Sequence, residues 1–233
     1  MIAFLVAAAV AAAPVATPGQ CPDVLTAEAY QCKAMRAVRS GNSAEAAEMF
    51  EQGAGLAGAH EQAARMLAAA GNLRISAEQP DRAAADLDKA LAMAGLDGPQ
   101  RGEALLDRAR AAAAKGDLPT ARSRLTDAVS LIPEDPFLWY FSAAVAMREG
   151  NASVAQSSIA KALALAPTDP TILFEAGHVA HYAGDDVAAR SYWQQAADRD
   201  PHGQSGKSAR EALALLPAPL VIKEAPATAP KKN

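Results

Sequence analysis

"GDLPTARSRLTDAV", residues 116–129, decides the fold, because its spacing returns twice along the chain. "GNASVAQSSIAKAL" starts at residue 150 and "GDDVAARSYWQQAA" at residue 184, so the three stretches begin 34 residues apart. Each opens with Gly followed by Asp or Asn. Each also carries one bulky apolar residue with one periodic alanine before it and one after it. The alanines are Ala121, Ala155 and Ala189, then Ala128, Ala162 and Ala196; the bulky residues are Leu125, Ile159 and Trp193.

The residues around these stretches keep the same period. Its further members are Pro133, Pro167 and Pro201; Leu105, Trp139 and Leu173; and Ala109, Ala143 and Gly177. Glycine ends one helix in a left-handed turn without a Cβ penalty, and proline cannot continue the second helix. Small residues let two helices approach closely while bulky ones fill the space between neighbouring pairs. The period therefore predicts repeated helix-turn-helix units.

Residues 102–203 resemble three uninterrupted members of the tetratricopeptide repeat (TPR) family, as units 102–135, 136–169 and 170–203. Two divergent copies precede them, at about 27–60 and 64–97 within an N-terminal region 20–98. These copies rest on Tyr30, Ala34, Gly41, Ala46, Phe50 and Gly53, and on Gly71, Ala83, Leu87 and Ala90. The resemblance implies an all-α, right-handed solenoid of about five repeats, followed by a capping helix at 205–216.

Composition agrees with an all-α protein and narrows the ligand classes. The chain is 51% hydrophobic, only 5% aromatic, and its formal charge is −4. Ala, Leu, Arg, Glu and Gln favour helix, and the basic residues form no stripe. Nucleic acid and an anionic membrane surface are therefore not expected as ligands.

"PHGQSGKS", residues 201–208, ends like a phosphate-binding loop. Such a loop needs a glycine where this chain has Pro201, and a preceding strand where this chain has helical sequence. No nucleotide or other cofactor is expected. Instead, Ser208 is expected to cap the final helix, with Glu211 completing a capping box.

The two ends of the chain differ from the repeats. Residues 1–19 read as a secretory signal segment with an apolar run but no Lys or Arg, and 217–233 as a Pro- and Ala-rich flexible tail. The mature chain is expected to hold no membrane span. Cys21 and Cys32 are the only cysteines and are disulfide candidates. A periplasmic or secreted location, from a bacterial source, is expected; a cytoplasmic one is the alternative.

A stripe of large residues on the first helices of the late repeats is the main functional signal. By resemblance to the family, this face lines a concave groove that binds a protein or peptide, with arginines adding charge. The groove residues are Arg110, Phe137, Tyr140, Met147, Arg148, Phe174, His178, His181 and Tyr182, with Arg65 as a further candidate. The Lys and Asn pattern of carboxylate-clamp members is absent, since Asn72 stands alone.

Three alternatives stay open at this point. The stripe can pack inside the protein, in which case Tyr140 and Phe174 are core residues. The chain can self-associate as a homo-oligomeric structural module. His178 and His181, one helical turn apart, can belong to a metal-dependent enzyme, although no third ligand stands at a fixed spacing. A non-catalytic scaffold or adaptor, with no metal site, is the function that the sequence favours.

Overall fold

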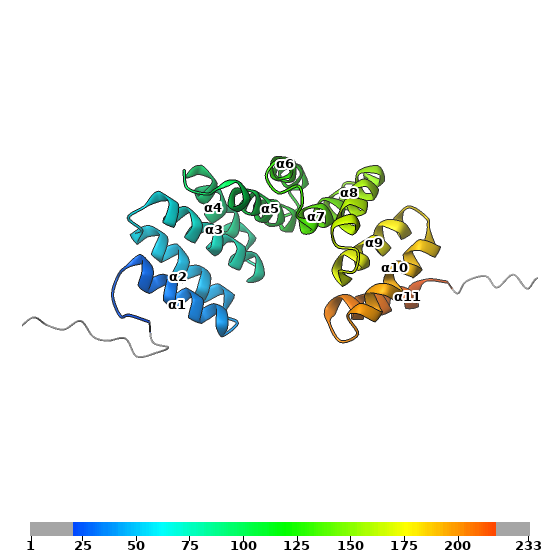
Figure 1. Cartoon of the computed structure of the whole chain (residues 1–233), viewed down its shortest axis with the longest axis horizontal. Coiled ribbons are helices and arrows are strands. Elements are labelled where there is room, and N and C mark those ends of the chain that lie inside the picture. The colour runs from blue at the N-terminus through cyan, green and yellow to red at the C-terminus, as the bar shows by residue number, and fades with distance from the viewer. Residues whose placement is uncertain (1–20, 218–233) are drawn as a thin grey trace, which may run out of the picture. The chain divides into compact units, whose positions relative to one another are not determined.

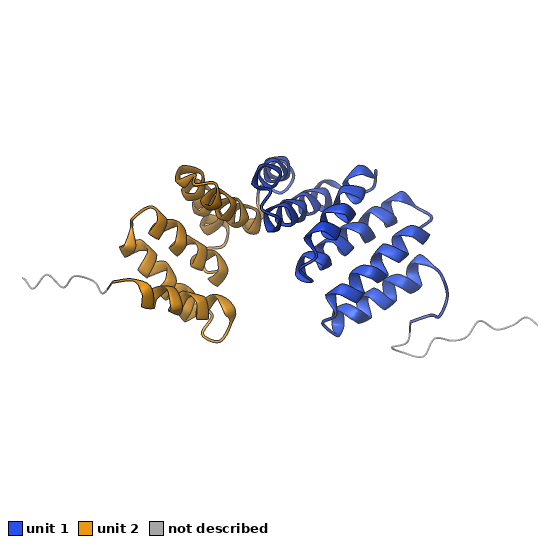
Figure 2. Cartoon of the chain, turned by 180° about the vertical axis from the view of Figure 1, so that it is seen from behind, with its two compact units in different colours: residues 1–133 blue, residues 134–233 orange. Residues whose placement is uncertain are grey.

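The computed structural model describes residues 21–217, and this part of the chain holds eleven α-helices and no strand (Figure 1). It divides into two compact units on either side of the boundary between residues 133 and 134, and the described residues of these units are 21–133 and 134–217 (Figure 2). The sequence predictions for the signal segment and for the tail beyond Pro217 fall outside the described residues. No helix among residues 21–217 combines the length and the apolar character that crossing a membrane requires.

Unit 1 is a series of three helix pairs. Its helices are α1 (Ala27–Arg39), α2 (Ser43–Leu56), α3 (His60–Ser76), α4 (Pro80–Ala92), α5 (Gly98–Ala114) and α6 (Leu118–Val129). Each helix packs against the next in sequence, and α3 also contacts α5. The first helices of the second and third pairs therefore lie beside one another, as in a solenoid.

Unit 2 continues the same scheme with two pairs and a terminal helix. Its helices are α7 (Pro136–Arg148), α8 (Ala152–Leu165), α9 (Pro170–Tyr182), α10 (Asp186–Arg199) and α11 (Gln204–Leu215). Helix α9 contacts α7, and α11 covers both α10 and α9. The final helix thus shields the last pair, and the predicted all-α solenoid fold is confirmed.

The turns within the pairs explain why the period is so regular. In all five, a backbone N–H just before the second helix donates to a carbonyl five residues earlier, as from Asp117 to Ala112 and from Asn151 to Ala146. This bond requires a left-handed residue, which is Gly116 (φ 80°) or Gly150 (φ 73°) in these two turns. The Asp or Asn that follows then accepts from the N–H three residues on and caps the second helix.

The periodic residues form the cores of the units. Ala121, Ala155 and Ala189 are fully buried, and the bulky Leu125, Ile159 and Trp193 are buried among them. The approach of α9 to α10 is so close that a Cβ on Gly177 would meet the Trp193 indole at 2.3 Å. The small residue and the large one are therefore complementary halves of one contact.

The predicted cap of the last helix is wrong. Helix α11 begins at Gln204, so Ser208 lies inside it and accepts from the Gln204 side chain. The Asp200 carboxylate accepts from the N–H groups of Gly203 (2.8 Å) and Gly206 (3.3 Å) and so satisfies the helix start four residues earlier. Gly206, the glycine of "SGKS", sits against the carbonyl of Asp200, where a Cβ would be 1.8 Å from the oxygen.

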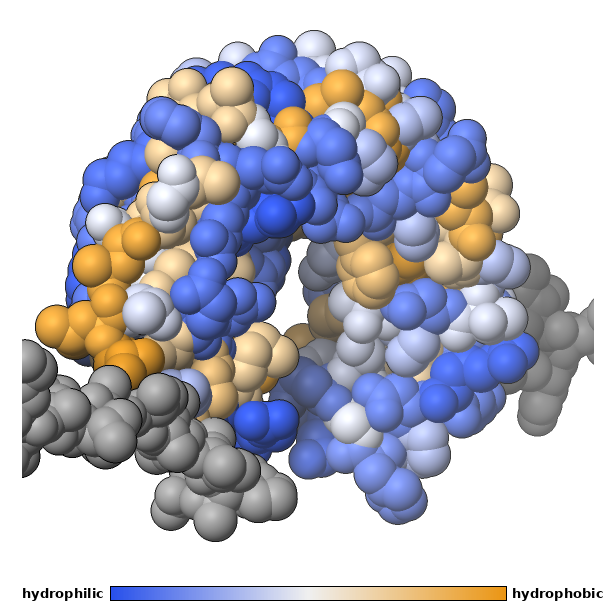
Figure 3. All heavy atoms as spheres, turned by 60° about the vertical axis from the view of Figure 1, so that its left-hand side comes forward, coloured by the Kyte–Doolittle hydropathy of each residue, from blue (hydrophilic) through white to orange (hydrophobic). Residues whose placement is uncertain are grey.

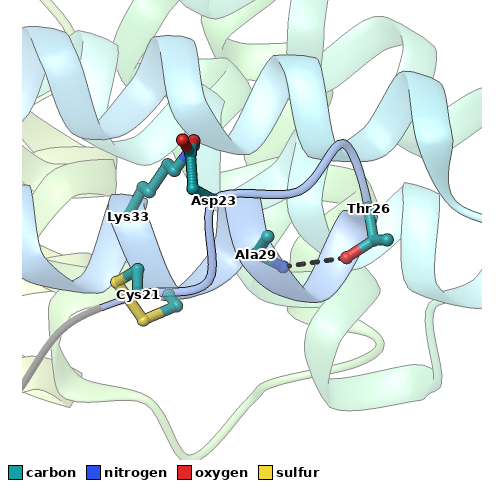
Figure 4. Close-up of a disulfide and its surroundings, with 6 residues drawn as sticks. Cys21, Asp23, Thr26, Ala29 and Lys33 are labelled. Carbon is teal, nitrogen blue, oxygen red and sulfur yellow. Dashed lines mark hydrogen bonds and ion pairs between the residues drawn. A yellow bond between two sulfur atoms is a disulfide. The ribbon is translucent and has the colours of Figure 1, made fainter. Parts of the chain in front are cut away.

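The start of unit 1 is fastened covalently (Figure 4). Cys21 and Cys32 form a disulfide with a Cα–Cα distance of 5.6 Å. Thr26 caps α1 by accepting from the N–H of Ala29, and Lys33 pairs with Asp23 at 3.7 Å. These contacts hold residues 21–26 along the first helix.

Candidate interaction groove

A groove on unit 1 runs along the first helices of its three pairs. It consists of two hollows of about 540 and 550 Å³. They share Phe50, Arg65 and Ala69, so together they form one continuous groove. The further lining residues are Met35, Ala68, Asn72, Leu73, Leu96, Gln100, Glu103, Ala104 and Asp107 in the first hollow, and Gln31, Ala59, Glu61, Gln62 and Met66 in the second.

Small residues on α3 open this groove. Ala68 and Ala69 lie where larger side chains would fill the space beside Phe50. Met35 on α1 forms part of the wall and is 45% exposed, which is high for a large apolar side chain. Figure 3 brings the N-terminal side of the chain forward and shows apolar, orange surface interrupting a largely hydrophilic exterior. The exposed part of Met35 is therefore apolar area in the groove wall that no described residue covers.

The charged residues of the groove are mostly paired within unit 1. Arg65 binds Glu61 one turn earlier at 2.6 Å. Asp107 receives Arg110 at 2.7 Å and the amide of Asn72 at 2.8 Å, which ties α3 to α5. Arg110, a predicted groove residue, thus lies next to the lining, but its charge is paired with Asp107.

The predicted residues of α7 have mixed environments. Phe137 is 48% exposed and meets the ring of Tyr140 edge-on at 6.3 Å. Tyr140 and Met147 are half-buried and pack against the core around Ile159. Arg148 is exposed as the last residue of the helix.

The predicted residues of α9 gather around one tryptophan. Phe174 and His178 form an edge-to-face pair at 4.5 Å, and His178 and His181 approach the Trp193 ring at 5.3 and 5.8 Å. The Trp193 indole N–H donates to the carbonyl of Phe174 at 3.0 Å. Much of this stripe therefore contacts α10, while Tyr182 at the helix end is 50% exposed.

His178 and His181 contact other side chains of unit 2. His181 Nδ1 lies 2.6 Å from the Asp186 carboxylate. Burial and the neighbouring His181 lower the pKa of His178. Among residues 21–217, no three His, Cys, Asp or Glu side chains are placed to hold a metal ion together.

Comparison of the sequence with protein families gives one match. Residues 68–136 match the tetratricopeptide repeat model. This part of the chain belongs to the TPR family. No curated protein sequence matches it significantly.

Several solved TPR structures share the fold. The thermophilic TPR protein TTC0263 of Thermus thermophilus is 18% identical with a TM-score of 0.65, covering 82% of this chain and all of that one. PilW, a type IV pilus biogenesis factor, is 20% identical with a TM-score of 0.64, covering 79% and 82%. YrrB, described as a TPR protein with an unusual peptide-binding site, is 20% identical with a TM-score of 0.57, covering 79% and 92%. These similarities show that the chain shares the fold of these structures.

The sequence patterns did not indicate most of the groove of unit 1. They include Arg65 and Asn72 but predict the site on later repeats, where aromatic residues stand out. The signal was available, since Glu103 precedes the predicted Phe137 by one 34-residue period. The turns that begin α2, α4 and α6 are 37 and 38 residues apart, at Asn42, Gln79 and Asp117, so the insertions hid the phase upstream.

Proposed function

We propose that this TPR protein is a non-catalytic scaffold that binds a peptide or protein segment in the groove of unit 1. The observation that carries the proposal is the continuous groove shared by Phe50, Arg65 and Ala69, with Met35 exposed in its wall. Concave, mostly apolar clefts with a few polar groups are the usual ligand sites of proteins. The face of α7 and α9 carries the exposed Phe137 and Tyr182 as a second contact region.

The groove can be tested by filling it. Ala69 lines both hollows and is partly exposed, so Ala69→Trp places an indole where a ligand side chain would lie. Ala160→Trp, on the exposed side of α8, is the matched control. Affinity capture from extract of the source organism is compared for the wild type, both variants and Tyr140→Ala/Phe174→Ala. Loss of the same partners with Ala69→Trp alone supports the proposal.

A folding measurement and a second groove variant serve as controls for this experiment. Circular dichroism and thermal melting show whether Ala69→Trp stays folded, and Met35→Ala removes apolar wall without adding bulk. Partners that both groove variants retain would refute the groove. Partners lost only with Tyr140→Ala/Phe174→Ala would move the site to unit 2.

We infer in addition that the protein acts in an oxidising compartment, as a periplasmic or secreted protein. Support comes from the Cys21–Cys32 disulfide and from the apolar run of residues 2–13. Fractionation of cells expressing the full gene, with amino-terminal sequencing of the mature protein, tests the location. Recovery of uncleaved, reduced protein from the cytoplasm would contradict it.

Self-association is the second candidate function, and exposed apolar side chains favour it. Three apolar side chains near the start of unit 1 are exposed: Val24 (50%), Leu25 (77%) and Leu56 (48%). Exposed apolar residues of this size are common at interfaces. Light scattering during size exclusion measures the oligomeric state, and a dimer that Leu25→Asp/Leu56→Asp separates would establish the module as a homo-oligomer.

A further inference from the structure

The groove of unit 1 contains one carboxylate that its surroundings leave unpaired. Glu103 lies on α5, is exposed, and lines the first hollow. Within residues 21–217, no side chain forms a hydrogen bond or ion pair with it. The other charged lining groups are occupied, because Arg65 holds Glu61 at 2.6 Å and Arg110 holds Asp107 at 2.7 Å.

The pairing of Asp107 makes its charge a poor site for a ligand. Its carboxylate already receives the Arg110 guanidinium and the Asn72 amide at 2.8 Å. The Arg110 guanidinium already balances the charge of Asp107, whereas Glu103 has no counter-charge beside it among the described residues and is open to solvent. The groove therefore presents a single available negative charge beside an apolar floor.

The apolar floor and this charge line the same hollow. Leu73, Ala68 and Ala69 come from α3, and Gln100, Glu103 and Ala104 come from α5. A hollow of about 540 Å³ can hold more than one large side chain. A peptide can thus bury an apolar residue over the alanines while a neighbouring cation reaches Glu103.

From this juxtaposition we propose that the groove selects peptides in which a Lys or Arg stands next to a bulky apolar residue, with Glu103 binding the cation. This rests on the proposed function and names its ligand chemistry. Burial of the apolar residue supplies most of the affinity, because an exposed ion pair contributes only about a fivefold change in binding. Charge complementarity instead sets selectivity and salt dependence.

The test uses random peptides displayed on phage and the full chain as bait. Enriched sequences are compared for the wild type, Glu103→Lys, Ala69→Trp and Glu211→Lys. Glu211 is an exposed carboxylate on α11 and is the matched control for the charge reversal. The most enriched peptide is then synthesised with a fluorescent label and titrated by anisotropy at low and high ionic strength.

The wild type and Glu211→Lys are expected to enrich the same peptides, with Lys or Arg beside Leu, Ile, Phe or Met. Glu103→Lys is expected to weaken the labelled peptide about tenfold at low salt, and the difference should shrink at high salt. Enrichment without cationic residues, or affinity within about twofold of the wild type in Glu103→Lys, overturns the inference.

The Ala69→Trp arm separates this inference from the proposed function. If Ala69→Trp abolishes binding while Glu103→Lys does not, the groove binds peptides but the charge selectivity is wrong. If the peptides bind Ala69→Trp as well as the wild type, or if nothing is enriched, both proposals fail.

Discussion

Arg74 is the largest fully buried side chain of unit 1, and it is charged. Its side chain is 1% exposed and lies between Glu51 of α2 and Asp86 of α4. The Nε atom is 2.7 Å from the Asp86 carboxylate but is not aligned for a hydrogen bond. Burial and the nearby Glu51 raise the pKa of Asp86 to about 6, and the charges of Lys89 and Arg82 offset this only in part.

Replacing Arg74 by methionine is therefore expected to destabilise unit 1. Asp86 would remain buried with only the exposed Lys89 ammonium, 3.9 Å away, to balance its charge, and such losses cost about 3–5 kcal/mol. Urea unfolding at neutral pH measures the change. The double variant Arg74→Met/Asp86→Leu removes both charges and should recover most of the loss. A single variant with a cost below about 1 kcal/mol would show that Arg74 contributes little to stability.

Glu175 predicts a pH dependence in unit 2. This half-buried carboxyl on α9 has no hydrogen bond or ion pair within residues 21–217, and burial raises its pKa from 4.5 to about 7. The folded state thus holds the proton more tightly than the unfolded chain. Its contribution to stability is complete below pH 4.5 and is lost as the pH rises through 7.

The variant Glu175→Gln isolates this effect. At pH 8 the variant should be more stable than the wild type by about 2–3 kcal/mol, and near pH 4 the difference should vanish. Denaturant unfolding of both proteins across this range gives the difference directly, so that the contribution of Asp86 cancels. A difference that is independent of pH would mean that the Glu175 carboxyl is hydrated in the folded protein.

At the scale of the element, the helix-turn-helix pair explains what could be predicted from the sequence. Glycine at the left-handed position and Asp or Asn after it mark Gly116 and Gly150 by residue type alone. The turn between α3 and α4 has the same backbone bond, from Gln79 to Arg74, but places Glu78 at the left-handed position (φ 56°). Because no glycine marks it, the period was weaker there.

This turn gives a stabilising prediction. Glu78→Gly should raise the free energy of unfolding by about 1 kcal/mol, because a side chain in the left-handed region is unfavourable and glycine is not. The reverse change in an equivalent turn, Gly116→Glu, should lower it by a similar amount. Chemical denaturation measures both. Equal stability of all three proteins would show that the turn tolerates a side chain freely.

The groove was harder to predict than the pairs, for a reason visible in its residues. Repeat-defining positions such as Leu125 and Trp193 are fixed by burial, so residue size reveals them. Small groove residues matter because they leave space unfilled. Ala68 and Ala69 are therefore indistinguishable in sequence from the alanines of the core. Arg110 and Asp107 stand three residues apart on one helix, but only the fold shows that Asn72 also binds Asp107 and that Glu103 has no partner within residues 21–217.

For the molecule as a whole, the Cys21–Cys32 disulfide relates the free energy of unfolding to the redox state of the compartment. It links residues 11 apart and holds the segment that precedes α1 against that helix. Solenoid ends lack a neighbouring repeat on one side, so contacts that fasten them matter more than contacts within the array. Closing a loop of this length restricts the unfolded chain by about 2–3 kcal/mol.

Reduction is therefore expected to lower the stability of the mature protein by up to that amount, and Cys21→Ser/Cys32→Ser should show the same loss without reductant. The expected change is at the start of unit 1, so hydrogen exchange should accelerate in α1 and leave α9 and α10 of unit 2 unchanged. Exchange and urea unfolding are measured with and without reductant, and the serine variant serves as the control for reagent effects.

A loss of protection spread evenly over both units would mean that the two units unfold together. An unchanged free energy of unfolding would mean that residues 21–26 dock on α1 without the disulfide. The stability of the protein would then give no reason to expect an oxidising compartment.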